Sequence, residues 1–201
     1  MLGVVLFLTG IGTLDITSAA EVNHPNIVLI FTDDMGWGDL PNFTPKSKIK
    51  TPNISRLIAE GTKFDDFYVV QAVCTASRAA LMTGCYANRV GLEGALNHTS
   101  PTGISPKEEL LPELLTKAGY ATGMFGKWHL GMFTEEYTPT RRGFDRHEGY
   151  YQGCGSAWTH VAACCKAGSP TSDQDYTCAG QGLPEYRGYD WFKDGQPDVL
   201  E

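Results

Sequence analysis

Apolar and polar positions in the first 130 residues predict strands and helices that follow one another in turn. Residues 27–31 form an unbroken apolar run, which is typical of a strand buried on both faces, and residues 63–70 predict a second strand. After a glycine at position 119, a third strand is predicted to lead toward Lys127. The spacing between these runs leaves room for a helix in each connection.

Start and stop signals place three helices along the same stretch. Residues 52–60 have apolar positions at helical spacing, with proline first and glycine directly after. Residues 77–83 and 112–118 are also each followed by a glycine, and Leu114 and Leu115 are expected to face inward. Alternating strands and helices with short turns predict an α/β fold with a largely parallel sheet.

Chemically capable residues follow each predicted strand. Asp33 and Asp34 follow the first, Cys74 follows the second, and Lys127 and His129 follow the third. Functional groups of open α/β sheets gather at the carboxyl ends of strands, so we expect these residues to lie together.

Cys74 precedes a predicted helix and has two interpretations. At a helix N-terminus the backbone N–H groups favour a negatively charged nucleophile, and Arg78 one turn along adds positive charge. The alternative is a local disulfide with Cys85.

The other candidates also have structural alternatives. Asp33 and Asp34 are suited to Ca²⁺ or Mg²⁺, but two carboxylates are too few for a complete calcium shell, and an Asx-type turn is the alternative. Lys127 and His129 would point to the same side of a strand and reach one anionic ligand. A solvated lysine beside a structural histidine is the alternative, and it is common enough that this motif alone does not establish a site.

Composition narrows the classes of partner. The formal net charge is −7 and no cluster of five Lys or Arg occurs, which argues against a nucleic-acid-binding protein. Residues 1–20 resemble a secretory signal peptide, followed by one domain over residues 21–201, and no later stretch is apolar enough for a stable membrane span. The predicted location is therefore the secretory pathway, with secreted, lysosomal and periplasmic destinations left open.

The cysteines fit an oxidising compartment. Four of the six lie in a Cys/Gly-rich loop region that begins at about residue 150, where a pairing of Cys164 or Cys165 with Cys178 is expected. Three glycosylation sequons occur, of which the one at Asn97 is the best candidate for a glycoprotein site.

Five segments resemble those of type I sulfatases, in the same order. They are NIVLIFTDDMGWGD, TPNISRLIAEGTKF, CTASRAALMTG, LLTKAGYATGMFGKWHLG and PTRRGFDRHEGY. The later segment GYYQGCGSAWTH is most similar to the arylsulfatase B-like branch, and the resemblance extends from Pro25 to about Asp194.

This resemblance implies an alkaline-phosphatase-like sandwich and a specific chemistry. Cys74 matches the cysteine that a formylglycine-generating enzyme converts to Cα-formylglycine, whose hydrate attacks the sulfur of an aryl or carbohydrate sulfate ester. Asp33 and Asp34 match ligands of a divalent metal, Ca²⁺ rather than Mg²⁺, to which the modified Cys74 also binds. Arg78 matches the residue that supports the aldehyde hydrate, and Lys127 and His129 match sulfate-binding and charge-stabilising positions.

The chain departs from the family pattern in three respects. Ala76 replaces the usual proline of the modification motif, and Cys85 stands where arginine is usual. Nothing after Glu148 matches the family's second ligand pair, and members are roughly twice as long or more. We therefore expect an N-terminal portion of the catalytic domain, inactive alone. A phosphoester or phosphonate-ester hydrolase of the same superfamily and a catalytically silent module are the alternatives.

Overall fold

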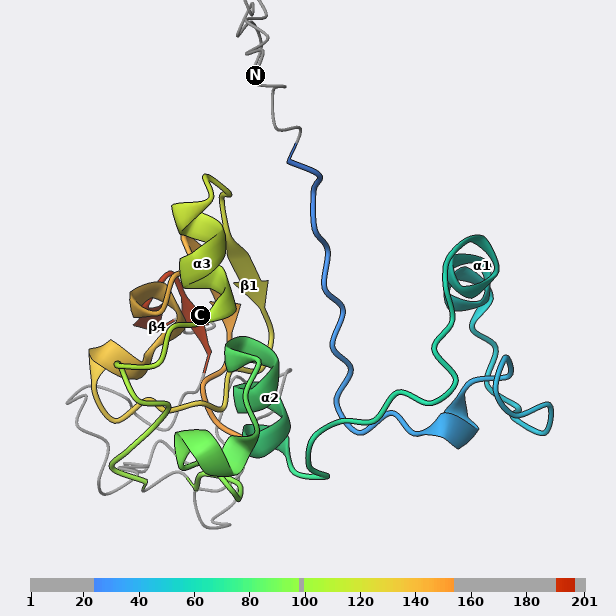
Figure 1. Ribbon diagram of the computed structural model, residues 1–201, viewed down its shortest axis with the longest axis horizontal. Coiled ribbons are helices and arrows are strands. Elements are labelled where there is room, and N and C mark those ends of the chain that lie inside the picture. Colours follow the sequence, from blue (N-terminus) through green and yellow to red (C-terminus); the bar gives the residue numbers. More distant parts are fainter. Residues whose placement is uncertain (1–23, 98–99, 154–190, 198–201) are drawn as a thin grey trace, which may run out of the picture. The chain divides into compact units, whose positions relative to one another are not determined.

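The computed structural model describes residues 24–97, 100–153 and 191–197 (Figure 1). The chain divides into two compact units, Met1–Phe31 and Thr32–Glu201. The predicted signal peptide, the cysteines from Cys154 onward and their expected disulfide lie outside the described residues.

The first predicted strand is not formed. Residues 24–31 of the first unit have no strand pairing, and Val28 is 83% exposed where burial on both faces was expected. An apolar run becomes a strand only when a neighbouring strand accepts its backbone hydrogen bonds. The prediction was wrong because periodicity says nothing about that neighbour.

The second predicted strand is wrong in the same way. Residues 63–70 have no strand pairing, and Phe64, Phe67 and Tyr68 are exposed, with Tyr68 at 80%. A β-prone sequence therefore forms no strand here, because no neighbouring strand pairs with it.

The three predicted helices are confirmed. They are α1 (Pro52–Glu60), α2 (Cys74–Thr83) and α3 (Leu111–Lys117). Proline stands in the first turn of α1 and α3, where its missing N–H costs no hydrogen bond, and Gly84 ends α2 in the left-handed region at φ 67°. The helix α2 begins at Cys74 itself, three residues before the predicted start.

The apolar faces of two helices are less buried than predicted. The helix α1 has no buried residue, and Leu114 of α3 is 48% exposed rather than facing inward. The helix α2, in contrast, packs against α3 and against the 3-10 helix η2 (Ala87–Val90) (Figure 1). Five residues of its first two turns are buried.

A small mixed sheet carries the segment that follows α3. It has the order β1 (Gly123–Phe125), β2 (Arg146–Gly149), β3 (Phe192–Lys193) and β4 (Gln196–Pro197). The pair β1–β2 is parallel and the other two pairs are antiparallel, so the described sheet is smaller and more mixed than the largely parallel one predicted. Three further 3-10 helices complete the described elements: η1 (Trp37–Asp39), η3 (Glu135–Tyr137) and η4 (Pro139–Arg141).

The core surrounds the segment that leaves β1. Trp128 is buried and packs edge-on against Phe144, and its indole Nε1 donates hydrogen bonds to the carbonyls of Gly131 and Tyr137. Other fully buried core residues are Ala79, Ile104, Leu110, Leu130, Tyr151 and Phe192. Because Trp128 stands between Lys127 and His129, its anchoring fixes the segment that carries both predicted site residues.

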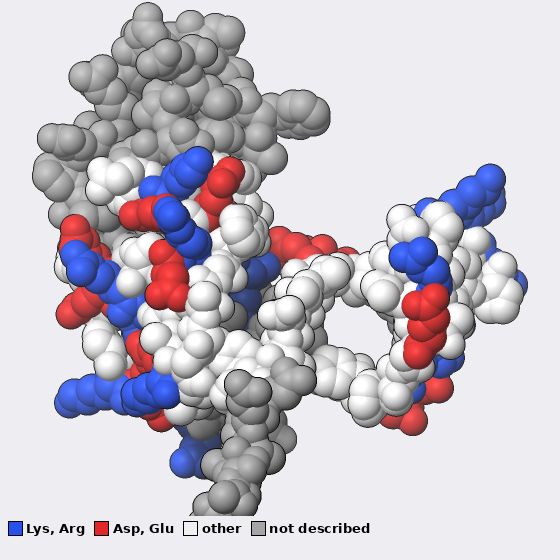
Figure 2. All heavy atoms as spheres, turned by 90° about the horizontal axis from the view of Figure 1, so that it is seen from above, with Lys and Arg blue, Asp and Glu red and all other residues white. Residues whose placement is uncertain are grey.

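On the face in Figure 2, acidic and basic side chains of the described residues are interspersed. Within the described part of the chain, no helix has both the length and the apolar character needed to cross a bilayer.

Candidate active site

Cys74 opens the helix α2. Val73 before it is extended, and the N–H of Ser77 donates to the Val73 carbonyl to close the first turn. The first N–H groups of a helix have no partner inside the helix, so the start of α2 favours a negatively charged group. The predicted placement of Cys74 at a helix N-terminus is confirmed.

The alternative of a Cys74–Cys85 disulfide is excluded. Both cysteines are free and half-buried. They stand at opposite ends of α2, and a helix rises about 1.5 Å per residue, so their Cα atoms are far beyond the roughly 7 Å limit for a disulfide.

Asp33, Arg78 and Lys127 form an ionic cluster. The guanidinium of Arg78 donates from Nη1 to the Lys127 carbonyl at 2.6 Å and from Nη2 to Asp33 Oδ1 at 3.2 Å. Lys127 Nζ donates to the second carboxylate oxygen of Asp33 at 3.0 Å. Residues from three distant parts of the chain thus meet, although two of the strands expected to bring such residues together are not formed.

The cluster also determines the protonation of Asp33. Partial burial acts to raise the pKa of this carboxyl, but the hydrogen bonds and positive charges of Lys127 and Arg78 outweigh it and hold the pKa below its usual value. Lys127 and Arg78 are themselves almost fully buried, so their charges are poorly screened by water.

The predicted metal ligands do not form a complete site. Both oxygens of Asp33 are bound to cations, and Asp34 is exposed with φ 57°. No group of three or more His, Cys, Asp or Glu residues able to hold a metal ion occurs among the described residues. Asp33, Asp34 and Cys74 therefore do not by themselves fit a divalent cation, which needs six or more oxygen ligands if it is Ca²⁺.

His129 lies beside this cluster but not on a strand. Its φ of 55° is in the left-handed region, and its N–H donates to the Tyr151 carbonyl at 2.9 Å. Its ring Nε2 bonds the Leu96 carbonyl at 2.7 Å. The prediction that Lys127 and His129 share one side of a strand is wrong, because the strand ends at Phe125.

The surroundings of the His129 ring favour its neutral form. Burial lowers its pKa most, the nearby charges of Lys127 and Arg78 lower it further, and the Leu96 carbonyl and the Asp33 carboxylate act in the opposite sense. The influence of these three charged groups places His129 within electrostatic reach of the ionic cluster.

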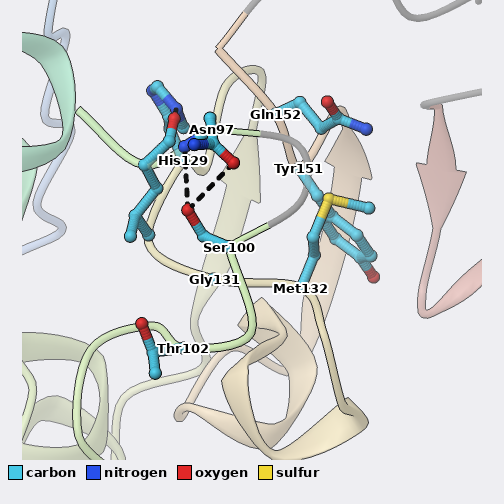
Figure 3. Close-up of a pocket in the computed structure, with 9 residues that line it drawn as sticks. Asn97, Ser100, Thr102, His129, Gly131, Met132, Tyr151 and Gln152 are labelled. Carbon is cyan, nitrogen blue, oxygen red and sulfur yellow. Dashed lines mark hydrogen bonds between the residues drawn. The ribbon is translucent and has the colours of Figure 1, made fainter. Parts of the chain in front are cut away.

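A small pocket adjoins the His129 ring (Figure 3). Polar side chains from the neighbouring loops line it, and the hydroxyl of Ser100 bonds the backbone N–H of Asn97 and its side-chain oxygen. Its lining residues are Leu96, Asn97, Ser100, Thr102, His129, Gly131, Met132, Tyr151 and Gln152.

Thr75 is a site residue that the sequence patterns did not single out. It follows Cys74 in α2, is fully buried, and bonds both the His129 carbonyl and the Leu96 N–H through its hydroxyl. A threonine in the first turn of a helix is ordinary, so no sequence signal distinguishes it. Its importance comes from two partners that are 21 and 54 residues away.

The chain matches one protein family over most of its length. The family model named Sulfatase matches residues 25–177, which is most of the sequence. This chain belongs to the sulfatase family. The resemblance seen in the five sequence segments is therefore confirmed.

Curated sulfatases are similar to the chain over about two thirds of its length. Human arylsulfatase A is 47% identical over 132 residues, which is 65% of this chain and 26% of that protein. Rat N-acetylgalactosamine-6-sulfatase is 43% identical over 148 residues, which is 70% of this chain and 28% of that protein. The chain thus spans about a quarter of the length of the curated sulfatases it matches.

Solved structures confirm the fold class. A crystal structure of Ps i-CgsB is similar with a TM-score of 0.70 at 34% identity, covering 88% of this chain and 37% of that one. The PsFucS1 sulfatase from Pseudoalteromonas sp. has a TM-score of 0.53 at 37% identity, covering 59% of this chain and 24% of that one. The predicted alkaline-phosphatase-like α/β fold is confirmed for this N-terminal part.

Proposed function

We propose that the sulfatase containing this chain hydrolyses sulfate esters with residue 74 as its nucleophile. The observation that carries the proposal is the ionic cluster beside the start of α2. Arg78, one helical turn after Cys74, bonds both Lys127 and Asp33, and Thr75, next to Cys74, bonds His129. Every predicted catalytic residue is therefore tied to the first turns of α2.

The charges of this site suit a sulfate group. Arg78 and Lys127 provide two nearly buried positive charges, and the free N–H groups at the start of α2 add a partial positive charge. Fixed positive charge in a place shielded from water stabilises negative charge that develops in a transition state. His129 adds a neutral imidazole within reach of the same charges.

The nucleophile in this proposal is Cα-formylglycine made from Cys74. One oxygen of its hydrated aldehyde attacks sulfur and displaces the alcohol of the ester as the S–O bond breaks. The second hydroxyl then loses its proton, the aldehyde re-forms, and the C–O bond to sulfate breaks. A divalent cation, Ca²⁺ in preference to Mg²⁺, would be held by Asp33, Asp34 and residue 74 together with ligands beyond the described residues, and it would act as a Lewis acid.

The first test is the mass of the peptide that contains residue 74. When the chain is produced together with a formylglycine-generating enzyme, conversion of CH₂SH to CHO should lower the peptide mass by about 18 Da. Cys85→Ala is the matched control, because it removes the free cysteine that follows α2 and leaves Cys74, so residue 74 should convert to the same extent. Cys74→Ala should show no such change.

A thiol at residue 74 that remains fully alkylatable would contradict the proposal. The chain would then be a silent module, which the incomplete set of described metal ligands also favours. We expect the chain to bind Ca²⁺ only weakly in equilibrium dialysis, because its set of ligands is partial. The variant Asp33→Asn should lose this weak binding.

A second test separates sulfate esters from phosphate esters. Both are tetrahedral anions, so an aryl sulfate and an aryl phosphate with the same leaving group differ only in the group that is transferred. The substrate class proposed is an aryl sulfate or a sulfated glycan; the relative Ps i-CgsB was solved in complex with k-i-k-neocarrahexaose, an oligosaccharide. Faster cleavage of the phosphate would indicate a phosphoesterase instead. Residence in the secretory pathway belongs to the same proposal.

A further inference from the structure

We propose that Thr75 is a positioning residue that fixes the orientation and the tautomer of His129. Its effect on catalysis rests on the proposed function, whereas the positioning depends only on contacts among the described residues. Three residues from separate segments carry the argument: Thr75 in α2, Leu96 in the loop that follows η2, and His129 after β1.

The hydroxyl of Thr75 joins the two other segments. It donates its proton to the His129 carbonyl at 3.0 Å and accepts the N–H of Leu96 at 3.0 Å. A hydroxyl has one proton and two lone pairs, so both bonds can form at once and their directions are determined. Thr75 is fully buried, and loss of the hydroxyl would leave both backbone groups without this partner.

Leu96, whose N–H is bound by Thr75, also bonds the His129 ring through its carbonyl. Its carbonyl lies 2.7 Å from His129 Nε2. A carbonyl oxygen only accepts, so Nε2 must carry the proton and Nδ1 of the neutral ring has the lone pair. Nδ1 is buried and has no hydrogen-bond partner among the described residues, so it is the ring atom left to accept a proton or a hydrogen bond.

The backbone of His129 needs the support that Thr75 gives. A left-handed φ is unfavourable for a residue with a side chain and persists only when the surroundings hold it. The N–H of His129 is held by the Tyr151 carbonyl, and its carbonyl is held by Thr75. The backbone N–H, the backbone carbonyl and the ring Nε2 of His129 therefore all form hydrogen bonds.

Gly153 limits the ring from another direction. A Cβ atom built on Gly153 would lie 2.6 Å from His129 Cε1 and 2.9 Å from Nε2. The ring therefore fills the space that a side chain at position 153 would take. With Leu96 bonded to Nε2 and Gly153 against the ring, a flip of the imidazole has little room.

The test compares Thr75→Val with Thr75→Ser. Valine has the shape of threonine without the hydroxyl, whereas serine keeps it. At about pH 8 the imidazole is neutral, and the ¹⁵N chemical shifts of His129 report which ring nitrogen has the proton. We expect a single Nε2–H form in the parent chain and in Thr75→Ser, and a mixture in Thr75→Val. Amide exchange at Leu96 should be on the order of ten times faster in Thr75→Val.

Thr83→Val is the matched control. Thr83 lies at the other end of α2, and its hydroxyl also donates to a backbone carbonyl, that of Ala79, and accepts a backbone N–H, that of Cys85. The same substitution there should lower stability in a similar way without changing the His129 signals.

Two results would overturn the inference. One is a folded Thr75→Val chain with His129 shifts and Leu96 exchange like those of the parent. The other is an equal change in Thr83→Val, which would mean that lost stability is the cause. These readouts do not need catalysis. If Cys74 is never converted but the His129 signals respond as expected, the proposed function fails and the positioning stands.

Discussion

Two consecutive arginines, Arg141 and Arg142, differ in burial and should therefore differ in their contribution to stability. Arg142 is 2% exposed, and its guanidinium bonds the Glu113 carboxylate and the carbonyls of Ile104 and Glu108. Arg141, next to it, is 63% exposed and pairs with a carboxylate at the surface. Nothing in the sequence distinguishes the two.

Replacing Arg142 should therefore cost far more than replacing Arg141. In Arg142→Ala the partly buried Glu113 carboxylate and two carbonyls lose their partner, and the free energy of unfolding should fall by about 3 kcal/mol. In Arg141→Ala the loss should stay within about 1 kcal/mol, because water screens the exposed pair. Urea unfolding of both variants checks this, and equal losses would mean that the Arg142 contacts contribute nothing special.

At the scale of elements, α2 connects most of the candidate site. Its first turn carries Cys74 and Thr75, Arg78 follows one turn later, and Gly84 ends the helix in the left-handed region. The pattern of residues predicted this helix and its end correctly. It did not predict which side chains α2 buries, because that depends on the segments packed around it.

The left-handed end of α2 gives a stability prediction. A Cβ at Gly84 would meet no atom within 4 Å, so Gly84→Ala is strained only through its φ and should lower stability by about 1 kcal/mol. Gly94 also has open space, without a left-handed φ, and Gly94→Ala should be neutral or slightly stabilising. Thermal unfolding of the pair separates the two; an equal effect would exclude backbone strain at Gly84 as the cause.

At the scale of the whole molecule, His147 couples folding to pH. It lies buried in β2, stacked on Tyr151, which in turn stacks on Phe192 of β3. Burial lowers the pKa of His147 to about 4, while the Gly126 carbonyl and the Asp194 carboxylate act in the opposite sense. The unfolded chain therefore binds a proton at position 147 more readily than the folded one.

The folded chain therefore loses stability as the pH falls through the range in which unfolded His147 takes up a proton. The contribution of neutral His147 to the free energy of unfolding is complete above about pH 6.5, the ordinary pKa of histidine. It is lost as the pH falls toward 4, and the total loss over this range is up to about 3 kcal/mol. His147→Phe keeps the aromatic stack but cannot take up a proton, so its free energy of unfolding should fall less over the same range. Urea unfolding at several pH values compares the two chains, and parallel curves would show that His147 does not titrate as expected.

The sequence by itself determined the three helices, the glycine that ends α2, the strand that leads toward Lys127, the residues of the ionic cluster and the family. These follow from local signals, namely proline and glycine positions, helical spacing and short motifs that act within one turn or one strand. The tertiary structure alone decided that residues 27–31 and 63–70 stay unpaired, that Lys127 and His129 lie beyond a strand, and that Thr75 holds His129. Strand pairing, burial and hydrogen bonds between distant residues depend on partners that local patterns do not specify.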